Sequence, residues 1–228
     1  MHALYGSSNY FSGGAYRDYM RDDWIRIAQG QRRIKRIVAR TGIAGGRLLD
    51  VASASGFFGV AARSVGFDVT CIEPDEKLAR MGREAYGLLI IAATVEDCEL
   101  EPAAYDIVTI WGADVHFLHP VHSIEKLVTA IKPGGVLALT YQASDHWIRR
   151  IFPRMMTGWH MIYNHTDRSF EATLRRLGLE LVSRELEWQT VTVDHICRLL
   201  RLNAPGWLRV GVVRAPAISF RTVIARKS

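Results

Sequence analysis

The chain has 228 residues, of which 49% are hydrophobic and 23% are charged, and both shares are ordinary for a globular protein. This length suits a single domain with a substantial core, and no stretch is long and apolar enough to span a bilayer. The first residues lack the basic start and apolar run of a secretory signal, and the three widely spaced cysteines match no disulfide framework or zinc pattern. We therefore expect a cytoplasmic protein without a metal site.

The net charge of +6 is unevenly distributed. After Trp188 the only acidic residue is Asp194, while arginines continue to the end of the sequence. An anionic substrate or a membrane surface would suit such a distribution. Segments 145–163 and 196–214 are rich in Trp, Leu, Met and Arg, which is compatible with peripheral membrane contact, a lid or a homodimer interface.

Apolar residues at helical spacing predict an amphipathic helix over 17–40. Strands and helices then alternate, with strands predicted over 47–52, 68–73, 88–93, 105–111 and 134–141 and helices over 56–66, 74–87 and near 122–131. The last part has a helix over 169–178, a strand over 179–188, a helix near 192–202 and a strand over 217–226. Repeated strand–helix–strand units predict an α/β fold, a parallel sheet with helices on both faces.

The stretch from Leu48 to Gly59 is the most informative part of the sequence. It combines a buried strand containing Asp50, a turn of small residues and the start of a helix. Ligands of open α/β sheets bind beyond the carboxyl ends of the strands, where small residues let the backbone approach closely. About twenty residues later the second strand ends in Glu73, a carboxylate suited to accept hydrogen bonds from the ribose hydroxyls of an adenosine.

This pattern resembles the first motif, Asp-x-Gly-x-Gly-x-Gly, of the S-adenosylmethionine (SAM)-dependent methyltransferases with a Rossmann-like fold. Asp50 and Gly56 match the motif, Ala52 and Ala54 replace its first two glycines, and Glu73 matches the ribose-binding acid of the family. The segment 105–108 resembles the family's fourth strand, 131–135 its Pro-Gly-Gly turn before the fifth, and 175–180 its sixth strand with the preceding helix end. The bacterial small-molecule branch of the family is the most similar.

The resemblance implies a seven-stranded, mostly parallel sheet with helices on both faces, an antiparallel last strand and an N-terminal helical cap. Residues 1–228 are expected to form a single methyltransferase domain, with the cap over 1–40 and substrate-side insertions over 142–168 and 189–216. By the same resemblance, SAM is the cofactor, and the residues around it are Asp50, Ala52, Ser53, Ala54, Gly56, Phe57, Glu73, Pro74, Thr94, Val95, Glu96 and Trp111. For Glu96, a solvated loop position is the alternative.

Enzymes that bind NAD also use a small-residue turn, but theirs cradles a pyrophosphate. The turn here contains no lysine or arginine and therefore suits an uncharged nucleoside better. Glycine adopts a positive φ freely whereas alanine does not, so the turn would be strained if Ala52 or Ala54 required one. A domain that keeps the fold but has lost SAM therefore stays open as an alternative.

Methyl transfer to oxygen requires positioned reactants and, for an acceptor of high pKa, a base, for which histidine is the usual choice. His116 follows the fourth strand, where the similar family branch has a Glu-His pair, and is a candidate base; His165 is a second catalytic candidate. His160 and Tyr163 are candidates for contact with the acceptor. Ordinary loop or helix-capping roles are the alternatives for the three histidines. The spacing of His116, His119 and His122 lacks accompanying acidic ligands, so no metal is expected.

The expected function is methyl transfer to a small-molecule acceptor, with oxygen as the expected atom, in a glycan, lipid-linked or natural-product pathway. The positive charge would also suit an RNA or protein methyltransferase, which needs an open basic groove. Trp111-Gly112-Ala113-Asp114 stands where a base-methylating enzyme would carry Asn/Asp-Pro-Pro-Tyr, so no nucleic-acid partner is expected.

Overall fold

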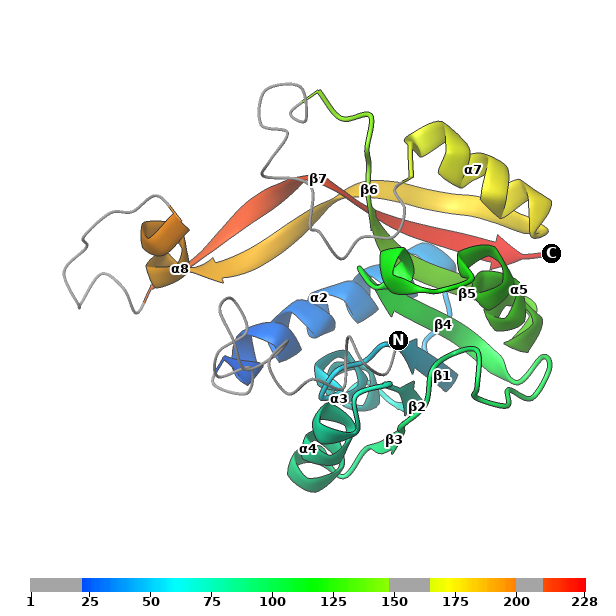
Figure 1. Ribbon diagram of the computed structural model, residues 1–228, viewed down its shortest axis with the longest axis horizontal. Coiled ribbons are helices and arrows are strands. Elements are labelled where there is room, and N and C mark those ends of the chain that lie inside the picture. Colours follow the sequence, from blue (N-terminus) through cyan, green and yellow to red (C-terminus); the bar gives the residue numbers. More distant parts are fainter. Residues whose placement is uncertain (1–21, 148–164, 200–210) are drawn as a thin grey trace.

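The computed structural model describes residues 22–147, 165–199 and 211–228. Within them, seven strands form one sheet in the order β3-β2-β1-β4-β5-β7-β6 (Figure 1). Strands β1 to β5 pair in parallel, and β7 runs antiparallel between β5 and β6. The predicted mostly parallel sheet with an antiparallel last strand is confirmed. Parts of the expected cap (1–21) and of the first expected insertion (148–164) lie outside the described residues.

The elements follow the predicted order with shifted ends. The strands are β1 (Gly46–Val51), β2 (Phe67–Ile72), β3 (Leu89–Ile91), β4 (Tyr105–Trp111), β5 (Ile131–Gln142), β6 (Leu179–Thr192) and β7 (Val212–Lys227). The helices are α2 (Asp23–Thr41), α3 (Phe57–Arg63), α4 (Glu76–Tyr86), α5 (Pro120–Ala130), α7 (Asp167–Arg176) and α8 (Val193–Leu199), with a 3-10 turn, η2 (Asp114–His116). In the described ranges, no helix is long and apolar enough to cross a membrane.

Helices cover both faces of the sheet and give it two hydrophobic cores. Neighbouring residues of β1 point to opposite sides, so Leu48 belongs to one core and Leu49 to the other. The core containing Leu48 is completed by side chains of α2, α3 and α4, and the core containing Leu49 by side chains of α5 and α7. The predicted α/β arrangement with helices on both faces is therefore present.

Strands β6 and β7 form a long hairpin that extends beyond the rest of the sheet, with α8 at its far end (Figure 1). The pairing continues to Thr192 opposite Val212, past a register shift between Leu186 and Trp188. The expected insertion over 189–216 thus begins within β6 and ends within β7. Its first and last residues are strand.

Helix α2 packs closely on α3 because Gly30 presents no side chain to it. A Cβ atom at Gly30 would lie 2.9 Å from the Cβ of Ala61, closer than packed atoms approach. The absence of that atom brings α2 down onto the sheet face that carries Asp50. Helix α2 therefore contributes side chains to the core and also lies over the end of β1.

A buried carboxylate fastens α2 to the distal strands of the sheet. Glu187 of β6 is 1% exposed, and its carboxylate accepts hydrogen bonds from Gln29 (3.2 Å), Arg33 (3.0 Å), Arg36 (3.4 Å) and the Thr222 hydroxyl. Burial by itself would raise the pKa of Glu187, but the charge of Arg33 and these hydrogen bonds hold the pKa below its usual value. The carboxylate is therefore ionised, and it binds three side chains of one helix.

The turn between β1 and α3 has an unusual backbone for its sequence. Ala52 and Ala54 have φ values of 54° and 52°, in the left-handed region that favours glycine. An L-residue there costs roughly 1–2 kcal/mol relative to its ordinary conformations. Gly56 has a φ of 77°, and a Cβ atom there would lie 2.5 Å from Leu88 Cδ1, so any other residue would need a left-handed backbone and a shift of the Leu88 side chain.

Replacing Glu187 by alanine is expected to lower the free energy of unfolding by about 3–5 kcal/mol, because the guanidinium of Arg33 loses its partner in a largely buried position. Chemical denaturation measures the loss. Glu185 provides the control, since it pairs with Arg40 at 2.7 Å on the surface and its removal should cost less than about 1 kcal/mol. Equal losses for the two variants would contradict a special role for Glu187.

Glycine at position 52 or 54 is expected to raise the free energy of unfolding by about 0.5–1 kcal/mol, because relief of the left-handed strain exceeds the extra chain entropy of glycine. Ala103, with a φ of 50° in the loop before β4, is the reference position and should respond in the same direction. Stabilisation by Ala103→Gly but not by Ala52→Gly or Ala54→Gly would show that the turn carries no strain.

Candidate active site

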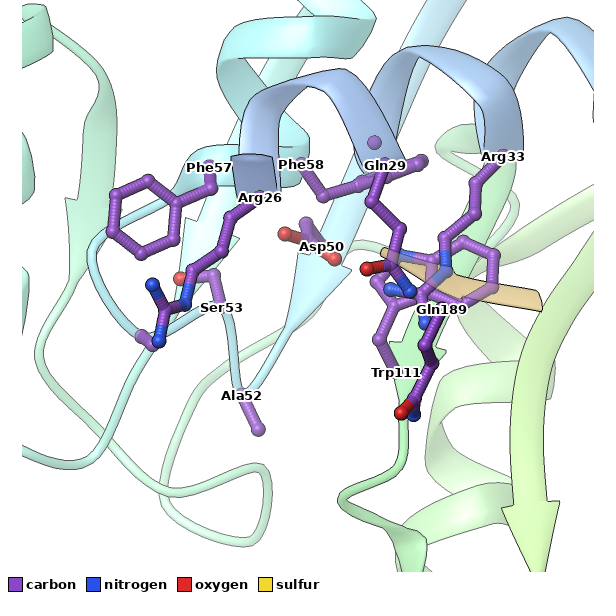
Figure 2. Close-up of a pocket in the computed structure, with 12 residues that line it drawn as sticks. Arg26, Gln29, Arg33, Asp50, Ala52, Ser53, Phe57, Phe58, Trp111 and Gln189 are labelled. Atoms are coloured by element: carbon purple, nitrogen blue, oxygen red, sulfur yellow. The ribbon is translucent and has the colours of Figure 1, made fainter. Parts of the chain in front are cut away.

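A pocket of about 310 Å³ lies beyond the carboxyl ends of β1 and β4, underneath α2 (Figure 2). This is the position at which open α/β sheets bind their ligands. The lining residues come from five parts of the chain: the end of β1 and the turn after it, the first turn of α3, the end of β4, helix α2, and β6. They are Arg26, Gln29, Gly30, Arg33, Asp50, Ala52, Ser53, Ala54, Phe57, Phe58, Trp111 and Gln189.

Asp50 contributes a buried carboxyl group to the pocket. Its side chain is 1% exposed, and its Oδ1 accepts a hydrogen bond from the Thr109 hydroxyl at 2.7 Å. Burial raises the pKa of Asp50 to about 7, against the opposing effects of Thr109 and the nearby charge of Arg33. A cationic ligand group in the pocket would therefore favour the ionised form of Asp50.

Arg33 places a positive charge in the same pocket. Its guanidinium lies 4.3 Å from the centre of the Trp111 ring and is bound to Glu187 at 2.8 Å. Burial lowers the pKa of Arg33, but the charge of Glu187 opposes this, and arginine stays protonated at any physiological pH. With Asp50 on one side and Arg33 and Arg26 on the other, the pocket presents groups of both signs, as a zwitterionic amino-acid moiety requires.

Glu73 stabilises the strained turn through a hydrogen bond to its backbone. Its side chain is almost fully buried, its Oε2 accepts the backbone N–H of Ala54 at 2.7 Å, and its Oε1 accepts that of Asp75 at 3.0 Å. Burial raises the pKa of Glu73 to about 7, although both backbone hydrogen bonds act in the opposite direction. Each carboxylate oxygen has a second lone pair, so Glu73 retains acceptor capacity for a ligand.

The structure brings together half of the residues expected around the cofactor. Asp50, Ala52, Ser53, Ala54, Phe57 and Trp111 line the pocket. Gly56, Glu73, Pro74, Thr94, Val95 and Glu96 are not among its lining residues. Two of these have internal roles, since Val95 belongs to the core beneath α5 and Glu96 Oε1 accepts the Ser123 hydroxyl of α5 at 2.7 Å.

The expected catalytic histidines lie on two segments that follow neighbouring strands. His116 ends η2, directly after β4, and is half-buried. His165 forms a parallel bridge with Ala143, just after β5, and its Nε2 lies 3.4 Å from Oδ2 of Asp114. His160 and Tyr163 lie outside the described residues. Among the residues that are described, no three His, Cys, Asp or Glu side chains form a group able to hold a metal ion.

Six lining residues were not predicted from the sequence: Arg26, Gln29, Gly30 and Arg33 of α2, Phe58 of α3 and Gln189 of β6. The side chains of Arg26, Gln29 and Arg33 point down from α2 into the pocket (Figure 2). A signal was available, because positions 26, 29, 30 and 33 fall on one helical face and three of them are polar. The apolar face of the same helix is enough to explain its packing, so the sequence alone does not assign the polar face to a pocket.

Comparison with known proteins indicates the family of the chain. A family model described as a methyltransferase domain matches residues 24–184. A ubiquinone biosynthesis O-methyltransferase of Xanthomonas campestris is 29% identical over 114 residues, which cover 47% of this chain and 48% of that protein. The chain thus spans about half the length of the curated relatives it matches.

Two solved structures share the fold across most of the chain. A SAM-dependent methyltransferase from Mesorhizobium loti has a TM-score of 0.60 at 16% identity, covering 85% of this chain and 96% of its own. The magnesium protoporphyrin IX methyltransferase of Synechocystis PCC 6803, solved with bound SAH, has a TM-score of 0.60 at 15% identity, covering 96% of this chain and 91% of its own.

The range matched by the family model begins in α2 and ends in β6, so it contains the turn after β1, Glu73 and the end of β4. The pocket occupies the place in the sheet where the fold binds its ligand, and it offers both charges of an amino-acid moiety. The chain belongs to the methyltransferase-domain family described by this model, and it has the Rossmann-like fold of the two SAM-dependent and SAH-bound methyltransferases.

Proposed function

We propose that this enzyme transfers the methyl group of SAM to an oxygen atom of a small-molecule acceptor. The observation that carries the proposal is the position of His116 and His165 on the segments after β4 and β5, at the sheet edge where Trp111 of β4 lines the pocket. A histidine base suits a small alcohol or phenol as the acceptor. An RNA or protein substrate would instead call for an open basic groove.

The choice of oxygen is supported by the O-methyltransferase of Xanthomonas campestris, which matches about half of this chain. An alcohol or phenol oxygen also suits the histidines after β4 and β5, because such an acceptor loses a proton during transfer. An RNA or protein acceptor is the competing outcome, which the basic charge of the chain would favour.

The pocket residues fit SAM group by group. Asp50 offers a carboxylate to the ammonium of the methionine moiety, and Arg33 offers a guanidinium to its carboxylate. Phe57 supplies apolar surface. Glu73 does not line the pocket, but it binds the turn that does, and in our proposal its remaining acceptor capacity serves the ribose hydroxyls. When bound, SAM supplies a methyl group on a sulfonium, a good leaving group. The protein's own contribution is therefore to orient the reactants and to accept a proton.

Of the catalytic candidates, His116 and His165 follow neighbouring strands at the same edge of the sheet, on the side where β4 contributes Trp111 to the pocket. In our proposal the acceptor enters between these segments. His160 and Tyr163 are proposed to contact the acceptor from the adjoining part of the chain.

Calorimetric titration is expected to show micromolar binding of SAM and no binding of NAD, because the turn after β1 carries no cation for a pyrophosphate. Arg33→Met should weaken SAM at least about tenfold, equivalent to ~1.4 kcal/mol. Arg32→Met is the matched control, since Arg32 bonds Thr190 and does not line the pocket. Equal losses in the two variants would refute the role of Arg33, and no SAM binding by the wild type would favour a domain that has lost its cofactor.

Incubation with SAM labelled at the methyl group is expected to label phenols or alcohols from a panel of phenols, alcohols, amines, total RNA and cell protein. Analysis of the labelled product by mass spectrometry identifies the methylated atom. Label in an amine would overturn the assignment to oxygen. Label in RNA or protein alone would overturn the small-molecule acceptor.

The affinity for SAM is expected to rise between about pH 6 and pH 8. Because burial raises the pKa of Asp50 and Glu73 to about 7, the free protein holds protons that the ionised, ligand-binding forms must release. For the same reason, the free energy of unfolding of the ligand-free protein should fall as the pH rises from the pKa values of these groups in the unfolded chain to about 7. Titrations in buffers of different ionisation enthalpy count the released protons.

Glu73→Gln should flatten this pH dependence, and Glu73→Ala should weaken SAM more than about tenfold, because the ribose hydroxyls lose their acceptor. Asp75→Asn is the control, since Asp75 Oδ1 accepts the N–H groups of Lys77 and Leu78 at the start of α4. A SAM affinity that Glu73→Ala leaves unchanged would refute the ribose contact.

A further inference from the structure

Two arginines from distant parts of the chain meet beside the pocket. Arg32 of α2 donates a hydrogen bond to the Thr190 hydroxyl of β6, and Thr190 pairs in register with Arg214 of β7. Side chains of directly opposite residues in an antiparallel pair lie on the same face, with Cβ atoms about 4.5–5.5 Å apart. The hydrogen bond to Thr190 therefore brings the guanidinium of Arg32 next to the side chain of Arg214.

Arg214 is held in place by an aromatic ring. Its guanidinium lies 5.0 Å from the centre of the Trp188 ring. Trp188 stands two residues before Thr190 in β6 and therefore shares its face of the strand. A guanidinium stacked on a ring keeps its N–H groups directed to the side, where they can reach the oxygens of an anion. Arg214 is exposed and Trp188 is 39% exposed, so a ligand from solution can approach them.

The two guanidinium groups act on each other as like charges. Burial, and after it the charge of Arg214, lower the pKa of Arg32. The charge of Glu187 opposes this effect, but its carboxylate is already bound by Arg33 and Arg36. Within the described ranges, neither Arg32 nor Arg214 forms an ion pair with a carboxylate. An anion bound between the two groups would replace their repulsion by attraction.

This arginine pair adjoins the pocket. Gln189, which stands between Trp188 and Thr190 in β6, lines the pocket, and so does Arg33, the residue after Arg32 in α2. Consecutive Cα atoms are only about 3.8 Å apart, so the arginine pair is within the length of a small molecule of the pocket. Neither arginine of the pair is itself a lining residue. The pair is therefore separate from the groups proposed to bind the methionine moiety.

We propose that Arg32 and Arg214 bind a phosphate group of the acceptor, so that the substrate is a phosphate-bearing small molecule. This inference rests on the proposed transfer to a small-molecule acceptor, and it names the class of that acceptor. A phosphate monoester carries about 1.5 to 2 negative charges at neutral pH, which balances two guanidinium groups, whereas a carboxylate carries one. The fork of N–H groups on each arginine also matches the spacing of phosphate oxygens.

Binding of phenyl phosphate to the SAH-saturated protein tests the assignment without turnover. Calorimetric titration in a phosphate-free buffer of low salt is expected to give a dissociation constant of about 1 mM or lower. Benzoate should bind more weakly, because it carries less charge. Arg32→Met and Arg214→Met should each weaken phenyl phosphate at least about tenfold and leave the affinity for SAH unchanged. No binding by the wild type, or binding that both variants retain, would overturn the proposal.

Arg175→Met is the matched control. It removes the same charge from α7, which packs on the other core of the sheet, where Arg175 pairs with Glu171 at 3.2 Å. It should leave the affinity for phenyl phosphate within about twofold, because a distant exposed charge is screened. A loss as large as that of Arg214→Met would show that only net charge matters and would refute the site. If Arg32→Met does not fold, Arg214→Met decides, since Arg214 donates no hydrogen bond within the described residues.

Vesicles and RNA distinguish the source of the phosphate. Phosphatidylcholine vesicles with and without phosphatidylglycerol, and total RNA, are titrated separately with the wild type and with Arg214→Met. Because the site is expected to serve a small molecule, neither vesicles nor RNA should bind through Arg214 more tightly than phenyl phosphate does. Tighter binding that Arg214→Met abolishes would assign the arginines to a lipid surface or a nucleic acid and overturn the assignment to the acceptor.

Turnover separates this inference from the proposed function. With hydroxyphenyl phosphate as the acceptor, Arg214→Met should raise KM at least about tenfold with kcat within about twofold, and it should leave the KM for catechol unchanged. Equal effects on both acceptors would refute the phosphate contact. Absent SAH binding refutes the proposed function, whereas normal SAH binding without phenyl phosphate binding refutes only the arginine site. If neither acceptor is methylated, the titration with phenyl phosphate decides.

Discussion

The ion pair between Glu187 and Arg33 is the interaction on which the active site depends. Its carboxylate, on β6, accepts hydrogen bonds from three side chains of α2, and Arg33 is stacked on Trp111 at the same time. Without this attachment the end of β1 and the turn after it would still line the pocket, but α2 would no longer be held over it. The pair also fixes the guanidinium opposite the carboxyl group of Asp50, so that one ionic contact sets both the shape and the polarity of the site.

Much of the fold could be predicted because its signals are local. The apolar strands, the glycine-terminated helices and the acids at Asp50 and Glu73 all occur in short segments, and their order along the chain is enough to indicate the sheet. The sequence predicts an insertion over 189–216, and the ends of that range are strand residues of the β6–β7 hairpin. Its strand residues, such as Val191 and Val213, stand next to Trp- and Arg-rich stretches that favoured a lid or an interface, and the cross-strand pairing cannot be read along the chain.

The site was predictable only on the side formed by β1, α3 and β4. The α2 wall depends on Glu187, which is separated from Arg33 by 154 positions, and the hydrogen bond from Arg32 to Thr190 also joins distant segments. The sequence predicts a strained turn only if Ala52 or Ala54 has a positive φ, and in the structure both residues have one. Glu73 explains how the turn keeps this conformation, because its carboxylate binds the N–H of Ala54.

The position of β7 in the sheet has a consequence for the order of assembly. Strand β5 is completed on one side by β4, but on the other side only by β7, which is synthesised long after it. A chain emerging from the ribosome therefore carries an open, apolar strand edge until β7 is released, and such an edge invites pairing with other chains. Glu187 is also made late, so the cofactor pocket closes among the last events of folding. When the synthesis of the final segment is slowed, we therefore expect more of the protein to aggregate. The protein that stays soluble should keep its activity.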